Sequence, residues 1–149
     1  MRISVQEAPF DLGVESEAFA RNAEQIGAIV TFTGVVRDSD AGRLQVMEIE
    51  HYPGMTEKAL AAIANEAVER WDLGDVLVIH RFGRLAPGER IMMVATAARH
   101  RVAAFEAAEF LMDYLKSRAP FWKKELSATQ STWVAAKDED EDALNRWAR

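Results

Sequence analysis

Two lysines flank one predicted corner of the chain, and their surroundings favour acid–base chemistry. Lys116 falls near the end of an apolar, helix-like segment, Pro120 stops that segment, and Lys123 follows in an extended stretch. A lysine in the last turn of a helix is ordinary, because the carbonyl end of a helix favours positive charge. Phe121 and Trp122, however, predict a low-dielectric wall beside Lys123. The pattern therefore predicts an amine with a lowered pKa that exchanges protons near neutrality.

Alternation along this extended stretch does not choose between two neighbouring lysines. In a strand, Lys123 shares a face with Phe121, whereas Lys124 shares the opposite face with Trp122. Either amine could therefore lie beside an aromatic ring, and the choice stays open at the level of spacing alone.

Composition limits the classes of protein to which the chain could belong. The 149 residues, 49% of them hydrophobic, are enough for a single domain, residues 1–149, with its own core. Because there is no cysteine, any sulfur chemistry must take its sulfur from elsewhere. A net charge of -6 argues against general nucleic-acid binding. The amino terminus lacks the apolar core of a signal peptide, and no apolar run is long enough to span a bilayer, so we expect a soluble, cytoplasmic protein.

Other cationic residues stand at predicted strand ends and helix starts. Arg37 ends a strand, and His100 and Arg101 begin a helix, so their side chains could converge on a phosphate or carboxylate. Taken singly, each could equally be a solvated surface residue. His51, His80 and His100 lie far apart in sequence, so we predict no metal site and no resident cofactor. His80, inside an apolar strand, is interpreted as a hydrogen-bonded core or sheet-face histidine.

The order of apolar periodicities predicts an α+β fold, with helices packed on a mixed or antiparallel sheet. The strand at 43–52 is expected to form a hairpin with the strand at 27–37 and to place Met47 and Ile49 in the core. The apolar side of the third helix is assigned to Val102, Phe105, Ala108, Met112 and Leu115. The predicted strands are 2–7, 27–37, 43–52, 75–83, 90–98, 121–126 and 132–134, and the predicted helices are 14–25, 55–71, 101–118 and 138–149.

Several blocks, in order along nearly the whole chain, resemble the large, catalytic subunit of molybdopterin synthase. The blocks are Val30-Thr-Phe-Thr-Gly34-x-Val36-Arg37, Glu50-His-Tyr-Pro-Gly-Met-Thr56, Ile79-His-Arg81-x-Gly83, Ala98-x-His100-Arg101 and Met112-Asp-Tyr-Leu-Lys116-x-Arg-Ala-Pro-Phe-Trp-Lys123. The resemblance implies an α/β hammerhead-like fold and a sulfurtransferase of molybdenum cofactor biosynthesis. In that reaction, cyclic pyranopterin monophosphate receives two sulfurs and becomes molybdopterin, which carries a dithiolene.

The resemblance also implies partners. The sulfur donor is a thiocarboxylate on the C-terminal Gly-Gly tail of a small ubiquitin-like subunit. Two large subunits form a central homodimer within a heterotetramer, and each pocket takes residues from the neighbouring large subunit. This arrangement explains how an enzyme without cysteine can handle sulfur.

Residue roles follow from the positions that match the family blocks. Lys116 and Lys123 are the implied catalytic pair, Phe32 and Met112 line the pocket, and Arg37 binds the pterin or its phosphate. His100 and Arg101 reach in from the other protomer. Val35 is a departure, because relatives can carry lysine at that position. The loop at 38–42 is also short.

Two other functions fit part of the pattern. A non-catalytic adaptor could dock the ubiquitin-like tail on a sheet edge through main-chain hydrogen bonds, without chemistry from the lysines. An anion-binding metabolic enzyme without a protein partner would use Arg37 and Arg101, but it would leave the lysines and aromatic residues unexplained.

Overall fold

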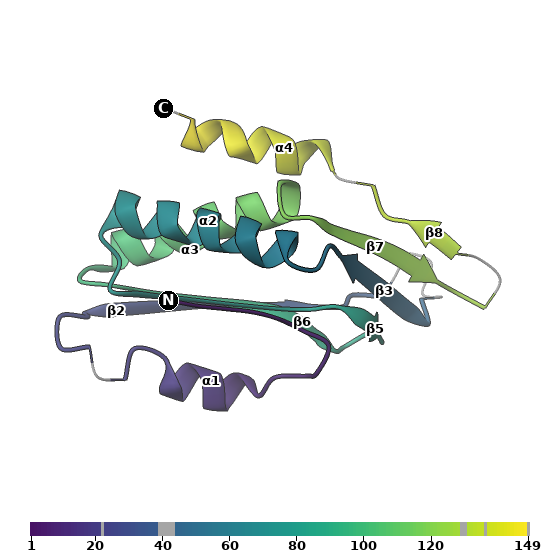
Figure 1. Ribbon diagram of the computed structural model, residues 1–149, viewed down its shortest axis with the longest axis horizontal. Helices are drawn as coiled ribbons and strands as arrows, with labels where there is room; N and C mark the ends of the chain where they lie inside the picture. Colours follow the sequence, from purple (N-terminus) through teal and green to yellow (C-terminus); the bar gives the residue numbers. More distant parts are fainter. Residues whose placement is uncertain (22, 39–43, 129–130, 136, 149) are drawn as a thin grey trace.

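The computed structural model describes residues 1–21, 23–38, 44–128, 131–135 and 137–148. Within these ranges, helices and strands alternate largely as predicted, and the α+β class is confirmed (Figure 1). The elements are β1 (Arg2–Gln6), α1 (Leu12–Ala18), β2 (Ala28–Val35), β3 (Val46–His51), α2 (Met55–Trp71), β4 (Asp75–Arg81), β5 (Gly83–Leu85), β6 (Arg90–Ala98), α3 (Arg101–Ser117), β7 (Phe121–Leu126), β8 (Ser131–Trp133), α4 (Asp138–Leu144) and the 3-10 helix η1 (Asn145–Trp147).

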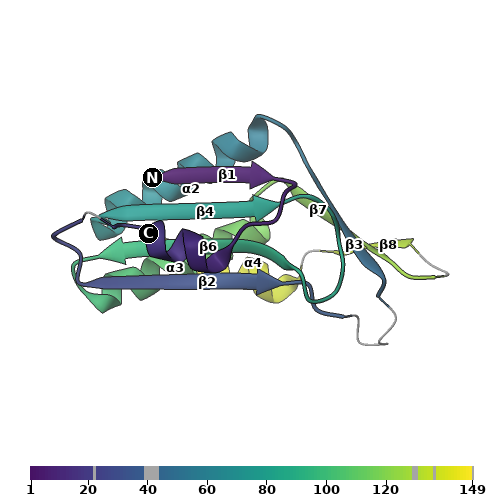
Figure 2. The same ribbon diagram turned by 90° about the horizontal axis from the view of Figure 1, so that it is seen from below.

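The larger sheet has the strand order β1-β4-β6-β2, as Figure 2 shows. β1 runs parallel to β4, and the other pairs are antiparallel. Helices α2 and α3 cover one face, and α1 covers the other (Figure 1). Because both faces are covered, β4 and β6 are buried at nearly every position, which explains their continuous apolar sequences.

The smaller sheet has the order β5-β3-β7-β8 and extends from one end of the larger one (Figure 1). The predicted hairpin between 27–37 and 43–52 is therefore wrong, because β2 pairs with β6 while β3 pairs with β5 and β7. Beyond β2, the backbone N–H of Val36 donates to the carbonyl of Glu89, so the chain remains hydrogen-bonded to the turn that precedes β6. In β3, Glu48 faces Lys124 across the strand pair, a favourable pairing of opposite charges.

A glycine carries the chain from one sheet into the other. The strand predicted over 75–83 ends at Arg81, and β5 of the smaller sheet begins at Gly83. Gly83 has a φ of 91°, a left-handed conformation that other residues adopt only with strain. This turn places the end of β4 next to the smaller sheet.

Helix α1 is shorter than predicted. It begins at Leu12, where the Asp11 side chain accepts a hydrogen bond from the backbone N–H of Val14, and it ends at Ala18 instead of residue 25. Phe19 is extended and Ala20 has a φ of 52°, so the helical path stops there. The Phe19 side chain is buried against the lower face of the larger sheet. Tertiary packing therefore decides this boundary.

Helix α3 turns only part of its predicted side to the core. Ala108 and Leu115 are buried and Met112 packs against the core, as predicted. Val102 and Phe105 are 60% and 61% exposed, so their assignment to the buried side is wrong. The buried side carries Ala104, Ala107, Ala108, Phe110, Leu111 and Leu115. Small alanines allow close approach to β6, where the Thr96 hydroxyl donates to the carbonyl of Ala104 at 2.7 Å. Because apolar residues surround much of this helix, periodicity alone did not select the correct side.

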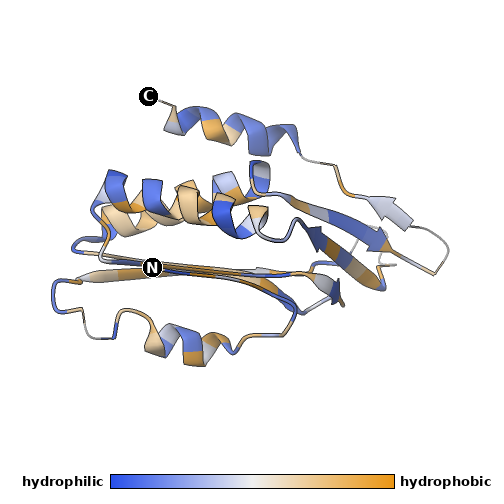
Figure 3. Ribbon diagram, in the orientation of Figure 1, coloured by the Kyte–Doolittle hydropathy of each residue, from blue (hydrophilic) through white to orange (hydrophobic). Residues whose placement is uncertain are grey.

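One hydrophobic cluster joins both sheets and the helices above them. It includes the predicted core residues Met47 and Ile49 from β3, and Leu60 and Ala64 from α2. Figure 3 shows hydrophobic residues along α2 and α3 and a largely hydrophilic α4. The smaller sheet is therefore held by the same core as the larger one.

The acidic run at 138–142 begins a helix, as predicted, and this helix lies against α3. The Ser117 hydroxyl donates to the carbonyl of Asp140 at 2.9 Å, and Arg118 forms an ion pair with Glu141. The buried Trp147 donates through Nε1 to Asp113 at 2.6 Å. Among the described residues, no helix is both long and apolar enough to cross a membrane.

Candidate active site

The two predicted catalytic lysines lie together. Lys116 is in the last turn of α3 and Lys123 is in the middle of β7, and both side chains line the same two cavities. The connection at 118–120 reverses the chain between them, and the N–H of Arg118 donates to the carbonyl of Tyr114 at 2.7 Å. The predicted corner thus brings two amines to one place.

The first cavity lies between the larger sheet and the end of α3. The structure brings four of the predicted site residues together here, namely Phe32, Met112, Lys116 and Lys123. The remaining residues around the cavity are Gly34, Val35, His80, Ile91, Met92 and Leu115. Most of this wall is apolar, so an amine within it is poorly hydrated.

Gly34 shapes the wall that β2 contributes. A Cβ atom at this position would lie 3.1 Å from Cγ of Met92, closer than side chains normally approach. The register between β2 and β6 also shifts between Gly34 and Val35. Both residues line the cavity, and irregularities of this kind are common next to functional sites.

The second cavity lies on the side of α4 and shares the lysines with the first. His80, Leu115, Lys116 and Lys123 line both cavities. The other residues of the second are Ala119, Phe121, Val134, Ala135, Lys137 and Asp140. The two amines are therefore accessible from two directions.

Lys123 has the perturbed amine that the sequence predicted. Burial lowers its pKa to about 8, and the positive charge of Lys116 lowers it further. Asp140 acts in the opposite direction and Lys137 in the same direction, both more weakly. A pKa near 8 leaves a useful fraction of neutral amine under physiological conditions.

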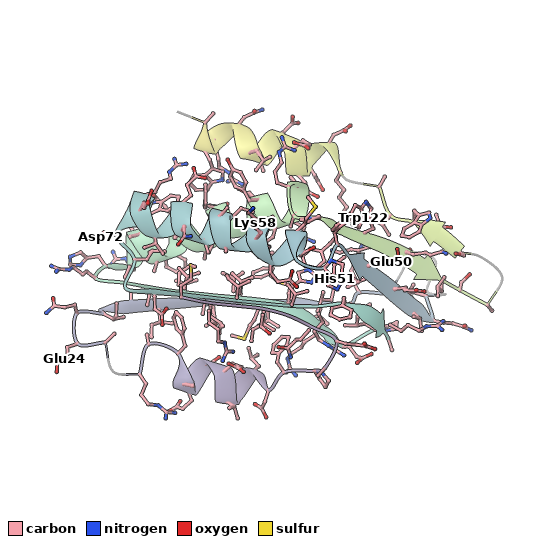
Figure 4. The ribbon with its side chains drawn as sticks, in the orientation of Figure 1. Glu24, Glu50, His51, Lys58, Asp72 and Trp122 are labelled. Atoms are coloured by element: carbon pink, nitrogen blue, oxygen red, sulfur yellow. The ribbon has the colours of Figure 1, made fainter. Side chains whose placement is uncertain are left out.

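The predicted aromatic wall is only half correct. Phe121 lies on the same face of β7 as Lys123, but Trp122 points the other way and is 49% exposed. Figure 4 labels Trp122 and its cross-strand neighbour Glu50 where β7 meets β3. Met112 and the ring of His80 complete the surroundings of the lysine. The choice between lysines is thus settled by the face of β7, because Lys124 instead lies 5.1 Å from the ring of Trp133.

His80 is a site residue that the sequence patterns did not single out. Its interpretation as a buried, hydrogen-bonded histidine is correct, since it is 5% exposed and its Nδ1 lies 2.8 Å from the Arg81 carbonyl oxygen. Burial lowers its pKa to about 3, and the charges of Lys123 and Lys116 contribute, although the hydrogen bond opposes the shift. The only signal in the sequence was its place in the block Ile79-His-Arg81-x-Gly83.

The remaining predicted site residues do not line either cavity. Arg37 is exposed, two residues beyond Val35 of the cavity wall. His100 and Arg101 are exposed at the start of α3, and the helical rise puts Arg101 about 22 Å from Lys116. Within one chain, these two residues therefore lie far from the two lysines.

Metal-ligating side chains are not gathered anywhere in the described part of the chain, where no group of three or more His, Cys, Asp or Glu could hold an ion. The cavities instead contain positively charged side chains and an amine that can lose its proton near neutral pH. These groups can bind anions and move protons.

The family model described as MoaE protein matches residues 5–118. The chain belongs to the MoaE protein family. The molybdopterin synthase catalytic subunit of Cereibacter sphaeroides is 67% identical to it over 147 residues, which cover 99% of this chain and 100% of the relative. The resemblance that the sequence blocks indicated is confirmed, and with it the predicted function as a molybdopterin synthase catalytic subunit, an enzyme.

Two solved structures have a similar fold. A molybdopterin biosynthesis MoaE protein from Burkholderia ambifaria MC40-6 superposes with a TM-score of 0.84 at 51% identity, covering 97% of this chain and 96% of that one. Molybdopterin synthase from Staphylococcus aureus gives a TM-score of 0.82 at 31% identity, covering 91% of this chain and 98% of that one. This chain thus has the same fold as both solved structures.

Proposed function

We propose that this MoaE family protein uses Lys116 and Lys123 to transfer sulfur to cyclic pyranopterin monophosphate. The sulfur comes from the thiocarboxylated C-terminus of a small ubiquitin-like subunit, and the product is the dithiolene of molybdopterin. The observation that supports this best is the shared cavity wall, where two amines from α3 and β7 meet and one has a lowered pKa. Residues 1–149 are proposed to act as one domain in the cytoplasm.

The charges of the reactants explain why two amines are useful. Both the thiocarboxylate and the substrate phosphate are anions, and the chain as a whole has a net charge of -6. Local positive charge must therefore hold the two reactants together. Lys116 and Lys123 supply it inside the cavities, and Arg37, close to Val35 in the chain, is proposed to bind the pterin or its phosphate.

The chemistry also requires proton movement. The thiocarboxylate sulfur attacks a pterin carbon and forms a C–S bond, while a C–O bond at that carbon breaks and the leaving oxygen takes up a proton. Water then cleaves the acyl–sulfur bond, so that the sulfur stays on the pterin and the tail leaves as a carboxylate. An amine with a pKa near 8 can take up and return protons during these steps. We assign Lys116 to the reacting carbonyl, and Lys123, the amine with the lowered pKa, to proton transfer and to stabilisation of the substrate and intermediate.

The distance along α3 supports a pocket shared between protomers. Arg101 is about 22 Å from Lys116 along the helix, and His100 lies just before Arg101, outside the helix. They can serve a pocket with Lys116 only if a second large subunit contributes them. The proposed assembly is therefore a homodimer of large subunits within a heterotetramer, with Phe32 and Met112 lining each pocket.

An adaptor without catalytic function is the second candidate. β8 stands at the edge of the smaller sheet, and its described residues are exposed, so an extended tail could pair with it. This role would not depend on the pKa of Lys123.

Reconstitution of sulfur transfer distinguishes the two functions. Purified protein, the thiocarboxylated small subunit and cyclic pyranopterin monophosphate are combined, and dithiolene formation is measured. We expect Lys116→Ala and Lys123→Ala each to lower the rate about 10²- to 10⁴-fold. Lys124→Ala is the matched control, because that amine lies on the other face of β7 near Trp133, and its rate should stay within about twofold of wild type. Product formation at the wild-type rate by the double lysine variant would favour the adaptor.

Mixed dimers test the shared pocket. A His100→Ala protomer combined with a Lys116→Ala protomer should regain part of the activity, because one of the two pockets then has both residues. Verified heterodimers without any recovery would place each site within a single chain.

A further inference from the structure

Arg81 is a buried cation that has no part in the function assigned above. It is the last residue of β4, belongs to the block Ile79-His-Arg81-x-Gly83, and is only 7% exposed. It lines neither of the two cavities that contain the lysines. Burial of a guanidinium is costly unless its N–H groups find acceptors, so the partners of Arg81 indicate what its burial achieves.

The guanidinium of Arg81 connects two separate segments of the chain. Nε and Nη2 both donate to the carbonyl of Glu7, each at 3.1 Å. Nη1 donates to the carbonyl of Arg90 at 3.2 Å and to the carboxylate of Glu89 at 3.4 Å. A planar guanidinium can serve acceptors in these different directions at once, whereas the single amine of a lysine cannot. The segment after β1 and the turn before β6 are therefore held by one side chain.

Glu89 transmits this constraint to the turn at 86–89. One carboxylate oxygen contacts Arg81, and the other accepts a hydrogen bond from the backbone N–H of Ala86 at 2.5 Å. The hydrogen bond from Ala86, together with the bond and charge of Arg81, lowers the pKa of Glu89, although desolvation opposes the shift. The carboxylate therefore stays charged at neutral pH and closes the turn.

The same turn is hydrogen-bonded to the end of β2 in both directions. The N–H of Val36 donates to the carbonyl of Glu89, and the N–H of Gly88 donates to the carbonyl of Val36, both at 2.8 Å. The Val36 side chain is 2% exposed and belongs to the core. The next residue is Arg37, whose side chain is exposed. An exposed arginine thus extends from a backbone position that is fixed on its preceding side.

We propose that Arg81 is a positioning residue for Arg37, and that it acts through Glu89 and the turn at 86–89. Val35 lines the first cavity, and Arg37 follows about 7 Å further along the chain, so a fixed β2 end keeps its guanidinium at the edge of that cavity. A group that is already in place loses less conformational freedom when it binds the substrate phosphate. The inference rests on the proposed function of Arg37 and adds the residues that hold it.

Two variants interrupt these contacts at different points. Arg81→Met removes every N–H group of the guanidinium. Glu89→Ala removes the carboxylate at a position that is 44% exposed, so it tests the proposal even if Arg81→Met does not fold. Arg70→Met is the matched control. Arg70 is also mostly buried and donates to a backbone carbonyl, that of Trp147 at 3.0 Å, but it lies on α2 and lines neither cavity.

The first measurement is hydrogen exchange of the backbone amides of Val36 and Gly88, followed by NMR on the purified protein without substrate. We expect exchange at both amides to accelerate about tenfold or more in Arg81→Met and Glu89→Ala, relative to amides in the middle of β6. Arg70→Met should not change this ratio. Without a local acceleration in either variant, the proposal is overturned.

The second measurement is the steady-state rate of dithiolene formation with the thiocarboxylated small subunit. A contact with the phosphate, away from the reacting carbons, stabilises the bound substrate and the transition state alike. Arg81→Met and Glu89→Ala should therefore raise the KM for cyclic pyranopterin monophosphate about tenfold, with little change in kcat or in the KM for the small subunit. Arg70→Met should keep the wild-type KM.

A double variant tests whether the effect passes through Arg37. Glu89→Ala combined with Arg37→Ala should have the same KM as Arg37→Ala alone, because nothing is left to position. Two effects that multiply would overturn the proposal, as would a wild-type KM in both Arg81→Met and Glu89→Ala when Arg37→Ala raises it. If wild-type protein makes no dithiolene, or Arg37→Ala leaves KM unchanged, while the two amides exchange faster, the proposed function is wrong and the constraint on the β2 end stands.

Discussion

The two sheets of this protein differ in how completely they are covered. In the larger sheet, β4 and β6 are buried at nearly every position between α1 on one side and α2 and α3 on the other. In the smaller sheet, β7 is mostly half-buried and β8 is exposed. The larger sheet is built for stability, whereas the smaller sheet keeps side chains where they can meet a substrate or partner.

The active-site lysines lie where the two sheets meet. His80 from β4 and Phe121 from β7 stack across this junction, and Lys123 follows on the same strand. The larger sheet contributes a dry wall that lowers the pKa of the amine, and the smaller sheet leaves that amine accessible. Neither sheet alone would provide both properties.

Truncation in the larger sheet should have the largest effect on folding. Leu77 in β4 is buried against the face covered by α1, so Leu77→Ala should lower the free energy of unfolding by about 2–5 kcal/mol. Urea denaturation measures this change, and the m-value checks that unfolding remains cooperative. A loss under about 1 kcal/mol would show that the larger sheet is not the stable part of the comparison.

Acid should weaken the larger sheet through His80. Its pKa is about 3 in the folded protein and 6.5 in the unfolded chain, so between these values the unfolded state binds more protons and stability falls as pH falls. The slope from this residue is about 1.4 kcal/mol per pH unit.

Denaturation at several pH values from 6.5 to 4 tests this expectation. His80→Gln should reduce the slope, because glutamine does not titrate, whereas His100→Gln, at an exposed position, should not. Equal slopes in wild type and His80→Gln would assign acid sensitivity to other groups.

Removal of the Lys116 amine should change the pKa of Lys123. The positive charge of Lys116 helps to lower the pKa of Lys123, so Lys116→Ala should raise that pKa from about 8 toward its ordinary value of 10.5. NMR titration of the remaining lysines measures the shift. Lys124→Ala serves as control, since that lysine is not among the groups that perturb Lys123. No rise would mean that the charge of Lys116 does not contribute to the lowered pKa of Lys123.

The smallest effect is expected at the edge of the smaller sheet. Trp133 is 52% exposed and contacts the Lys124 amine at 5.1 Å. Because exposed cation–π contacts contribute little, Trp133→Ala should lower the free energy of unfolding by about 1 kcal/mol or less. The same denaturation assay applies, and a loss as large as that of Leu77→Ala would remove the distinction between the sheets.

The sequence predicted many of the strands and helices of the two sheets, but not how they pair and pack. The continuous apolar runs identified β4 and β6, and the residues around Pro120 identified the corner between the two lysines. Strand pairing was wrong for β3, because the nearest strand in sequence was assumed to be its neighbour. The buried side of α3 was wrong at Val102 and Phe105, since more than one side of that helix is apolar.

By itself, the sequence determined which residues could do chemistry: a chain without cysteine, two lysines at a proline corner, and blocks shared with the MoaE family. Only the tertiary structure decided that His80 reaches the same cavities as the two lysines and that His100 and Arg101 line neither of them. The physical reason is that sequence patterns report on neighbouring residues, whereas the surroundings of a side chain depend on residues distant in sequence. Local spacing fixes the face of one strand or helix, but many of the neighbours that dehydrate the amine come from β2, β4 and β6, far away in sequence.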